Sequence, residues 1–250
     1  MEDFLRRFHF QPDFEGYIGV EREMWTVSPG TKNLVAVTPL IFAHHPEGRI
    51  KPELPVHQIE VTTKPCVDIN RLTHDLARLM NVLKRWGQEF CFEVCHECLP
   101  PSAFEVEVYP KPRYLDILEH LGPERLRNGW ITSVHIHYGC RDFGQAIRIL
   151  NHIRTQLDYF SKLSTFGAES KRLEVYAKMC SEIVPPVIDS TEHLYELARN
   201  RGFNLDPRSC WWGVRISPHG TVEVRIFDNH PDLDVPFLAR EVQRAAQVAL

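Results

Sequence analysis

Ionisable side chains stand at every second position within several otherwise apolar stretches of this sequence. Glu21 and Glu23 are two apart in the stretch GVEREMWTV, and His135 and His137 are two apart in ITSVHIHYG. The β-branched and aromatic residues around them predict β-strands, in which side chains two residues apart point to the same face. A carboxylate inside a sheet is costly unless it is paired or ligated. The pattern therefore predicts a sheet with one face that gathers charge.

Further strands and several helices follow from similar patterns. Strands are predicted over residues 16–27, 56–63, 90–98, 131–139, 211–216 and 221–227, the last two as a hairpin across a turn at 217–220. Helices are predicted from Asp68 as N-cap to Gly87, from Asp142 through Phe160, over 169–180, over 191–200 before Gly202, and in the final stretch REVQRAAQVAL. Strands that do not alternate strictly with helices indicate an α+β fold with a largely antiparallel sheet. The sequence shows no internal repeat, and we expect one domain.

Charge and composition exclude several classes of protein. The 250 residues carry a formal net charge of -4, with 43 % hydrophobic and 25 % charged residues, which is the balance of an ordinary globular protein. No run of Lys and Arg is long enough to follow nucleic acid, and no stretch approaches the ~20 apolar residues needed to cross a membrane. The opening MEDFLRRFHF does not resemble a signal peptide. Seven irregularly spaced cysteines fit a reducing compartment, so we expect a cytoplasmic protein.

Two more predicted strands carry acidic residues. Glu60 lies in the middle of one strand with Glu53 just upstream, and Glu223 and Arg225 are two apart in the last strand. Five carboxylates with one or two imidazoles on one face would bind a hard divalent cation, and such ligands suit Mg²⁺ or Mn²⁺ better than Zn²⁺. Taken singly, each pair is more typical of the solvated face of a half-exposed sheet. The order of the motifs along the chain favours the first interpretation.

The motifs occur in one order: Gly19–Glu23 (GVERE), Gln58–Thr62 (QIEVT) followed by Pro65-Cys66, His135–Gly139 (HIHYG), Trp212–Arg215 (WGVR) and Gly220–Asp228 (GTVEVRIFD). In this order they resemble the motifs of the bacterial type 2 glutamate–cysteine ligases, also described as carboxylate–amine ligases, in the glutamine synthetase superfamily. The resemblance runs from about Gly16 to Asp228, and TVEVRxxD after a Trp-rich strand is its most specific part. The chain ends shortly after this motif, where relatives continue with more helix. We expect residues 1–250 to form a single catalytic domain, and the early end is compatible with a fragment or with a C-terminally shortened branch of the family.

The resemblance implies a fold and a set of site residues. The fold would be a glutamine-synthetase-like α+β fold, in which a mostly antiparallel sheet forms an active-site funnel and helices pack on its other face. Two metals would be held by carboxylates and one imidazole: Glu23, Glu53 and Glu60 for one metal, and Glu21, His135 and Glu223 for the other. Arg225 would contact the transferred phosphoryl group, and Arg215 a phosphate or the substrate carboxylate. Together with Glu223 these arginines form the implied catalytic set, and His137 would lie near the nucleotide phosphates.

The same resemblance implies an ATP-dependent ligase that forms carbon–nitrogen bonds. ATP with Mg²⁺ or Mn²⁺ would convert a carboxylate into an acyl phosphate, from which an amine displaces phosphate to form an amide. Glutamate and cysteine are the family's usual substrates, although no residue here identifies them, and the family implies a homodimer. The sequence has no G-x-x-x-x-G-K-[ST], so phosphate binding would depend on metals and arginines. Two alternatives are a phosphagen-kinase-like phosphotransferase and a catalytically inactive relative that binds nucleotide.

One further cluster has a spacing that suggests chemistry. Cys91, Cys95 and Cys98 have the C-x3-C-x2-C spacing of radical S-adenosylmethionine enzymes, and the adjacent His96 is a type of ligand that zinc uses. In an alternating strand these side chains do not all face one way, which favours a strand with thiols near its end. The other four cysteines are predicted to be small core residues. Of the pair Trp211-Trp212, one ring is expected in the core and the other on the wall of the funnel.

Overall fold

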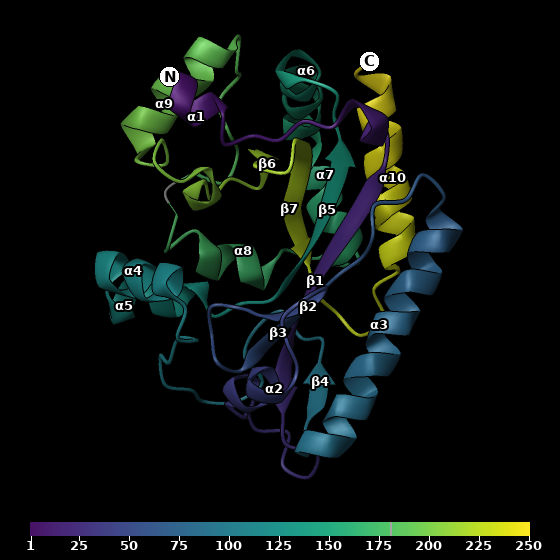
Figure 1. Ribbon diagram of the computed structural model, residues 1–250, viewed down its shortest axis with the longest axis vertical. Coiled ribbons are helices and arrows are strands. Elements are labelled where there is room, and N and C mark those ends of the chain that lie inside the picture. The colour runs from purple at the N-terminus through teal and green to yellow at the C-terminus, as the bar shows by residue number, and fades with distance from the viewer. Residues whose placement is uncertain (181) are drawn as a thin grey trace.

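A seven-stranded sheet forms the centre of the protein (Figure 1). The computed structural model describes residues 1–180 and 182–250. The strands are β1 (Ile18–Val27), β2 (Ile50–Pro52), β3 (Gln58–Thr62), β4 (Glu93–Cys95), β5 (Ser133–Gly139), β6 (Val214–Ser217) and β7 (Thr221–Asp228). Their order is β2-β3-β1-β5-β7-β6, with β4 paired to β1, and every pairing is antiparallel. The predicted α+β fold with an antiparallel sheet is confirmed.

Four helices cover one face of this sheet. They are α3 (Ile69–Phe90), α6 (Phe143–Ile153), α7 (Leu157–Ser164) and α10 (Val235–Val248). In Figure 1, α3 and α10 run side by side next to β1, while α7 lies against β7. Apolar residues on one face of the strands, such as Val20 and Met24 of β1 and Ile136 of β5, are fully buried in one cluster with the apolar stripes of these helices. Burial of each such side chain stabilises the fold by roughly 1.5–3 kcal/mol.

The remaining helices are shorter. They are α1 (Glu2–Leu5), α2 (Thr38–His44), α4 (Pro112–Leu121), α5 (Pro123–Leu126), α8 (Lys171–Tyr176) and α9 (Thr191–Arg201), with 3-10 turns at Pro12–Phe14, Arg127–Gly129, Arg154–Gln156 and Pro207–Ser209. Figure 1 shows α4, α5 and α8 on the side of the sheet away from α3 and α10. A second apolar cluster, which includes Trp25, Leu126, Trp130 and Tyr176, joins this layer to the sheet.

Three predicted helix ends are confirmed by their hydrogen bonds. The carboxylate of Asp68 accepts from the backbone N–H of Asn70 at the start of α3, and that of Asp142 accepts from Gln145 at the start of α6. Gly202 ends α9 in the left-handed conformation, with φ 78°.

Other predicted boundaries were wrong. Helix α3 does not stop at Gly87 but continues to Phe90, and Cys91 ends it with φ 55°. Gly87 is required for another reason: a Cβ there would lie 2.5 Å from the carbonyl oxygen of Phe92, which packs against the helix. The strand predicted over 90–98 is limited to Glu93–Cys95: α3 and its left-handed C-cap take residues 90 and 91, and only residues 93–95 pair with β1.

Two predicted helices are also shorter than expected. The helix predicted from Asp142 through Phe160 is divided by the 3-10 turn Arg154–Gln156, where the side chain of Arg154 donates to the carbonyl of Pro185. The helix predicted over 169–180 covers only Lys171–Tyr176, with Ser170 as its N-cap.

Within the described residues, no helix combines the length and the apolar character that a membrane span requires.

Candidate active site

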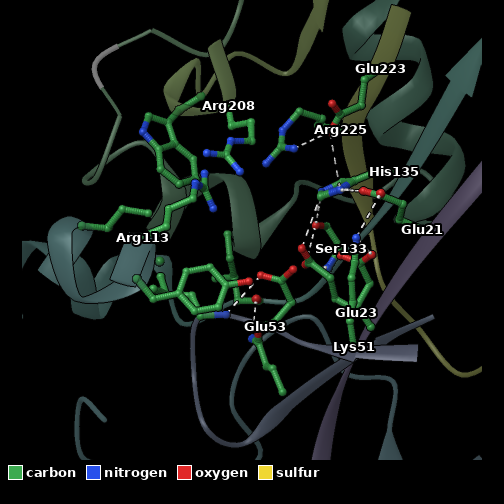
Figure 2. A pocket seen from close by; sticks show the side chains of 18 of the residues that line it. Glu21, Glu23, Lys51, Glu53, Arg113, Ser133, His135, Arg208, Glu223 and Arg225 are labelled. Carbon is green, nitrogen blue, oxygen red and sulfur yellow. Dashed lines mark hydrogen bonds and ion pairs between the residues drawn. The ribbon is translucent and has the colours of Figure 1, made fainter. Parts of the chain in front are cut away.

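A cavity of about 650 Å³ lies over the face of the sheet that α3 and α10 leave free. The strands form its floor, and α4, α8 and the segment around the 3-10 turn Pro207–Ser209 contribute its walls. All nine residues that the resemblance singles out line this cavity: Glu21, Glu23, Glu53, Glu60, His135, His137, Arg215, Glu223 and Arg225. Figure 2 shows Glu21, Glu23 and His135 pointing toward one another over the strands, with Arg225 next to them.

The register of the strands explains how these side chains meet. Glu21 of β1 lies opposite His135 of β5, and Glu23 of β1 lies opposite Glu60 of β3. Directly opposed residues of an antiparallel pair have Cβ atoms about 4.5–5.5 Å apart, so their side chains share one small volume. On the next pair of strands, His137 of β5 lies opposite Glu223 of β7. The floor is therefore a continuous band of ionisable groups across four strands.

Glu23, Glu53 and Glu60 form the first group of carboxylates. One oxygen of each lies within 4.8 Å of the other two, which is the spacing of ligands around one cation. Oε2 of Glu23 is held by Ser133, whose backbone N–H and hydroxyl both donate to it over 2.8 Å. Burial raises the pKa of Glu23 and, together with the charge of Glu21, raises the pKa of Glu60 well above its usual range. Ionised carboxylates at this position thus require positive charge, which a divalent cation would supply.

Glu21, His137 and Glu223 form the second group, again within 4.8 Å of one another. Nδ1 of His137 lies 2.8 Å from the hydroxyl of Thr221, while the buried Nε2 has no hydrogen-bond partner and lies 3.5 Å from Glu21. If Nδ1 donates to Thr221, Nε2 keeps its lone pair free for a metal.

His135 lies beside this second group with both ring nitrogens engaged. Nε2 is 2.8 Å from the hydroxyl of Ser133, and Nδ1 is 3.4 Å from Glu21 and 3.7 Å from Glu223. Burial and the neighbouring Arg225 lower the pKa of His135 to about 4, so the ring is neutral near pH 7. Both histidines of HIHYG therefore lie beside Glu21, and the one with a buried ring nitrogen that has no hydrogen-bond partner is His137.

The two arginines of the final motifs differ in how their donors are used. Arg215 holds both oxygens of Glu223 and also donates from Nη1 to the carbonyls of Arg208 and Cys210, each over 2.8 Å. Arg225 pairs with the same carboxylate of Glu223 through Nη1, but its buried Nε has no hydrogen-bond partner. Despite burial, these two arginines hold the pKa of Glu223 far below its usual range. Arg225 lines the cavity, and its Nη2 makes no hydrogen bond to the described residues, whereas the guanidinium of Arg215 is bound to the protein.

The structure adds residues that the sequence patterns did not single out. Lys51 of β2 lies 2.8 Å from Glu60 and 3.6 Å from Glu21. Its spacing of two from Glu53 was a signal, because it places both side chains on one face of an extended segment. Arg172 of α8 also lines the cavity and is paired to Asp228 over 2.8 Å. No local pattern indicates a contact between residues so far apart in sequence.

The outer wall carries aromatic and cationic groups. Arg113 and Arg208 lie on the side of the cavity opposite Glu21 in Figure 2, and both pair with Asp206. Trp211 lines the cavity, while Trp212 is only 4 % exposed in the core. The predicted division of this tryptophan pair is confirmed.

The cysteine cluster forms no ligand set. Cys91 is exposed at the end of α3, and within residues 1–180 and 182–250 no group of three ligand atoms closer than 4.8 Å includes a cysteine. Three of the remaining cysteines are buried as predicted: Cys140, Cys180 and Cys210. Cys66 is only half-buried, which corrects the expectation, because it follows β3 near the surface.

Comparison with known proteins identifies the family of this chain. The model of glutamate-cysteine ligase family 2 (GCS2) matches residues 17–246. Candidate glutamate–cysteine ligases 2 from Saccharopolyspora erythraea and Roseiflexus sp. (strain RS-1) are 28 % and 26 % identical over 93 % and 96 % of this chain. One from Gloeobacter violaceus is 29 % identical over 88 % of the chain. The chain spans 66 %, 68 % and 64 % of the length of these three relatives.

A solved structure shows the same fold. The bifunctional glutathione synthetase from Pasteurella multocida aligns with 99 % of this chain and 40 % of its own, with a TM-score of 0.65 and 14 % identity. The match of the family over nearly the whole chain agrees with the resemblance carried by the motifs. The chain belongs to glutamate–cysteine ligase family 2.

Proposed function

We propose that this protein uses ATP and Mg²⁺ to join a carboxylate to an amine. The observation that carries the proposal is the pair of ligand groups on the floor of one cavity, Glu23, Glu53 and Glu60 beside Glu21, His137 and Glu223. Membership of a ligase family supports the same reaction class. Glutamate and cysteine are the proposed substrates, and a homodimer in the cytoplasm remains part of the proposal.

The residues present fit divalent cations. Their donors are carboxylate oxygens and an imidazole nitrogen, the set that Mg²⁺ and Mn²⁺ accept, and the free buried Nε2 of His137 is a ligand without a partner. In this proposal Glu23, Glu53 and Glu60 hold one ion, and Glu21 and Glu223 with His137 hold the second; His135 is the alternative nitrogen. Bound Mg²⁺ would neutralise the phosphates of ATP and the charge that develops during phosphoryl transfer.

The arginines and Ser133 have distinct tasks. Arg225 lines the cavity with an Nη2 that makes no hydrogen bond to the described residues, and it is the proposed contact of the transferred phosphoryl group. Arg215 fixes both oxygens of Glu223, and Ser133 fixes one oxygen of Glu23. Neither carboxylate therefore has to change its orientation when a divalent cation binds to it. We propose that Arg215 acts by positioning Glu223 and not by contacting substrate.

The chemistry requires activation of the carboxylate. A carboxylate does not react with an amine, because the group that leaves would be oxide. Transfer of the γ-phosphoryl group of ATP to the carboxylate oxygen gives ADP and an acyl phosphate. The amine nitrogen then attacks the carbonyl carbon, phosphate leaves with the electron pair, and the amine loses a proton to give the amide. The protein contributes positions and charges to this sequence and needs no nucleophile of its own.

ADP release tests this function. The chain is incubated with Mg²⁺ and ATP and a panel of amino acids and amines, and ADP and amide are both measured. A ligase releases ADP only when a carboxylate and an amine are both present. Glu223→Gln should abolish release, because it keeps an oxygen for Arg215 but removes the charge of the ligand. The matched control is Glu196→Ala on the exposed surface of α9.

Each alternative has its own outcome. ADP release with one substrate and a stable phosphorylated product would show a phosphotransferase. Tight binding of Mg²⁺ and ATP without release across the whole panel would show an inactive nucleotide-binding protein. Near-normal turnover in Glu223→Gln would contradict the metal assignment.

A further inference from the structure

Lys51 stands between the two groups of ligands. It lies directly opposite Glu60 in the pairing of β2 with β3, and its ammonium is 2.8 Å from Oε1 of Glu60. The same ammonium is 3.6 Å from Oε1 of Glu21, while the other oxygen of Glu21 faces the imidazoles of His135 and His137. In Figure 2 Lys51 lies beneath Glu21 and next to Glu23. One amino group thus joins a carboxylate of the first group to one of the second.

The positive charges at the floor are unevenly distributed. Arg215 and Arg225 both pair with Glu223. Among the described residues, no Lys or Arg side chain other than Lys51 lies within 4.0 Å of Glu21 or Glu60. Two-thirds of its side chain is buried, since 33 % is exposed, and its ammonium contacts both carboxylates. Lys51 is therefore their counter-charge in this structure.

We propose that Lys51 is a built-in cation that competes with free divalent cations for these carboxylates. The inference rests on the proposed metal assignment. Without metal, the ammonium holds Glu21 and Glu60 close together despite their repulsion. When a divalent cation approaches Glu60, it meets both the ammonium and the hydroxyl of Thr62, which already donates to Oε1 over 2.8 Å. Free cations therefore bind weakly, and the triphosphate of ATP, by adding negative charge, makes loading of the metals depend on the nucleotide.

Mn²⁺ binding without nucleotide measures this competition. Lys51→Met keeps an unbranched apolar side chain as far as Cε and removes the ammonium with its charge. Because a unit charge about 4 Å from an ion repels it strongly in a partly buried site, we expect Lys51→Met to bind Mn²⁺ at least about tenfold more tightly than the unmodified chain. The difference should shrink when a non-hydrolysable ATP analogue is present.

A matched control and a second readout accompany the titration. Lys111→Met removes a lysine from the rim of the same cavity, where Lys111 pairs with Glu47, and should leave Mn²⁺ affinity within about twofold. Thermal unfolding in the presence of a chelator should show a lower melting temperature for Lys51→Met than for the unmodified chain, and Mn²⁺ should restore it. A packing role for Lys51 would lower the melting temperature without rescue by Mn²⁺.

The outcomes separate the inference from the function on which it rests. If the unmodified chain binds Mn²⁺ and Lys51→Met binds it equally or more weakly, the inference about Lys51 is overturned while the metal site stands. If neither protein binds Mn²⁺, the metal assignment fails and the inference fails with it. Binding that appears only in Lys51→Met would support the inference in its strongest form.

Discussion

Arg215 holds Glu223 by both carboxylate oxygens, with Nε 2.8 Å from Oε2 and Nη2 3.1 Å from Oε1. The pair spans the hairpin of β6 and β7, in which the two residues are directly opposed. The third nitrogen of Arg215, Nη1, donates to the carbonyl oxygens of Arg208 and Cys210 and so connects the hairpin to the segment that precedes it. Glu223 is only 1 % exposed, so its charge depends on this fork and on Arg225.

We predict that Arg215→Met lowers the free energy of unfolding by about 3–5 kcal/mol, because it leaves a buried carboxylate with half of its partners. Urea denaturation without metal measures this loss. Arg208→Met removes an exposed arginine from the neighbouring pair with Asp206 and should cost less than about 1 kcal/mol. Equal effects of the two substitutions would contradict the positioning role of Arg215.

We predict that His137, and not His135, supplies the nitrogen ligand of the second metal. Mn²⁺ bound to the chain should show magnetic coupling to an imidazole nitrogen in pulsed electron paramagnetic resonance. His137→Gln should remove the coupling and weaken Mn²⁺ binding about 10–100-fold, whereas His135→Gln should keep the coupling. Loss of the coupling in His135→Gln alone would restore the ligand set that the family resemblance implies.

We predict that His96 makes the protein less stable at acidic pH. Burial and the nearby charge of Arg22 lower the pKa of His96 to about 3, against about 6.5 in an unfolded chain. As the pH falls, the unfolded chain therefore binds a proton at His96 before the folded protein does. The contribution of the neutral His96 to the free energy of unfolding is complete above about pH 6.5 and is lost as the pH falls toward 3. At pH 5 the loss amounts to at most about 2 kcal/mol.

The matched pair of variants for this test is His96→Gln and His44→Gln. The difference in unfolding free energy between pH 7 and pH 5 should be smaller in His96→Gln than in the unmodified chain. His44 is exposed, and its substitution should leave that difference unchanged. A pH dependence that is the same in all three proteins would contradict the buried neutral state of His96.

We predict that Arg172 and Asp228 position Arg225. Asp228 accepts from Arg172 over 2.8 Å, and Arg172 also donates to the carbonyls of Arg225 and Ile226. Asp228→Ala should therefore lower kcat by about 10-fold or more with little change in KM, since it loosens the backbone that carries the phosphoryl contact. Asp228→Asn keeps an oxygen for Arg172 and for the hydroxyl of Ser170, and should recover most of the activity. Equal activity of the two variants would exclude this role.

The alternation of side chains between the two faces of a strand made much of the floor of the cavity predictable from sequence. Glu21 and Glu23 share a face because they are two apart in one strand, and no knowledge of the neighbouring strands is required. Which carboxylates form a group depends on register between strands, and the pairing of Glu23 with Glu60 follows from hydrogen bonds that local patterns do not show. The choice between His135 and His137 depends on single hydrogen bonds to Ser133 and Thr221.

Local signals failed where distant contacts decide the structure. Gly87 has the appearance of a helix end, but α3 continues to Phe90, and the glycine instead allows the close approach of the Phe92 carbonyl. Arg172 and Asp228 are 56 residues apart, so their buried pair is set by the packing of α8 against the sheet. The sequence does not predict a role for Lys51 at the site, because a lysine in a short strand is usually a solvated side chain.

The central claim is that the carboxylate is activated by phosphoryl transfer, and the fate of its oxygen tests that claim most directly. The chain is supplied with ATP, Mg²⁺, an amine and a carboxylate labelled with ¹⁸O, and the released phosphate is analysed by mass spectrometry. The account predicts that one labelled oxygen appears in the phosphate for each amide formed, and that Glu223→Gln produces neither product. Unlabelled phosphate, or a label that remains entirely in the carboxylate, would contradict it.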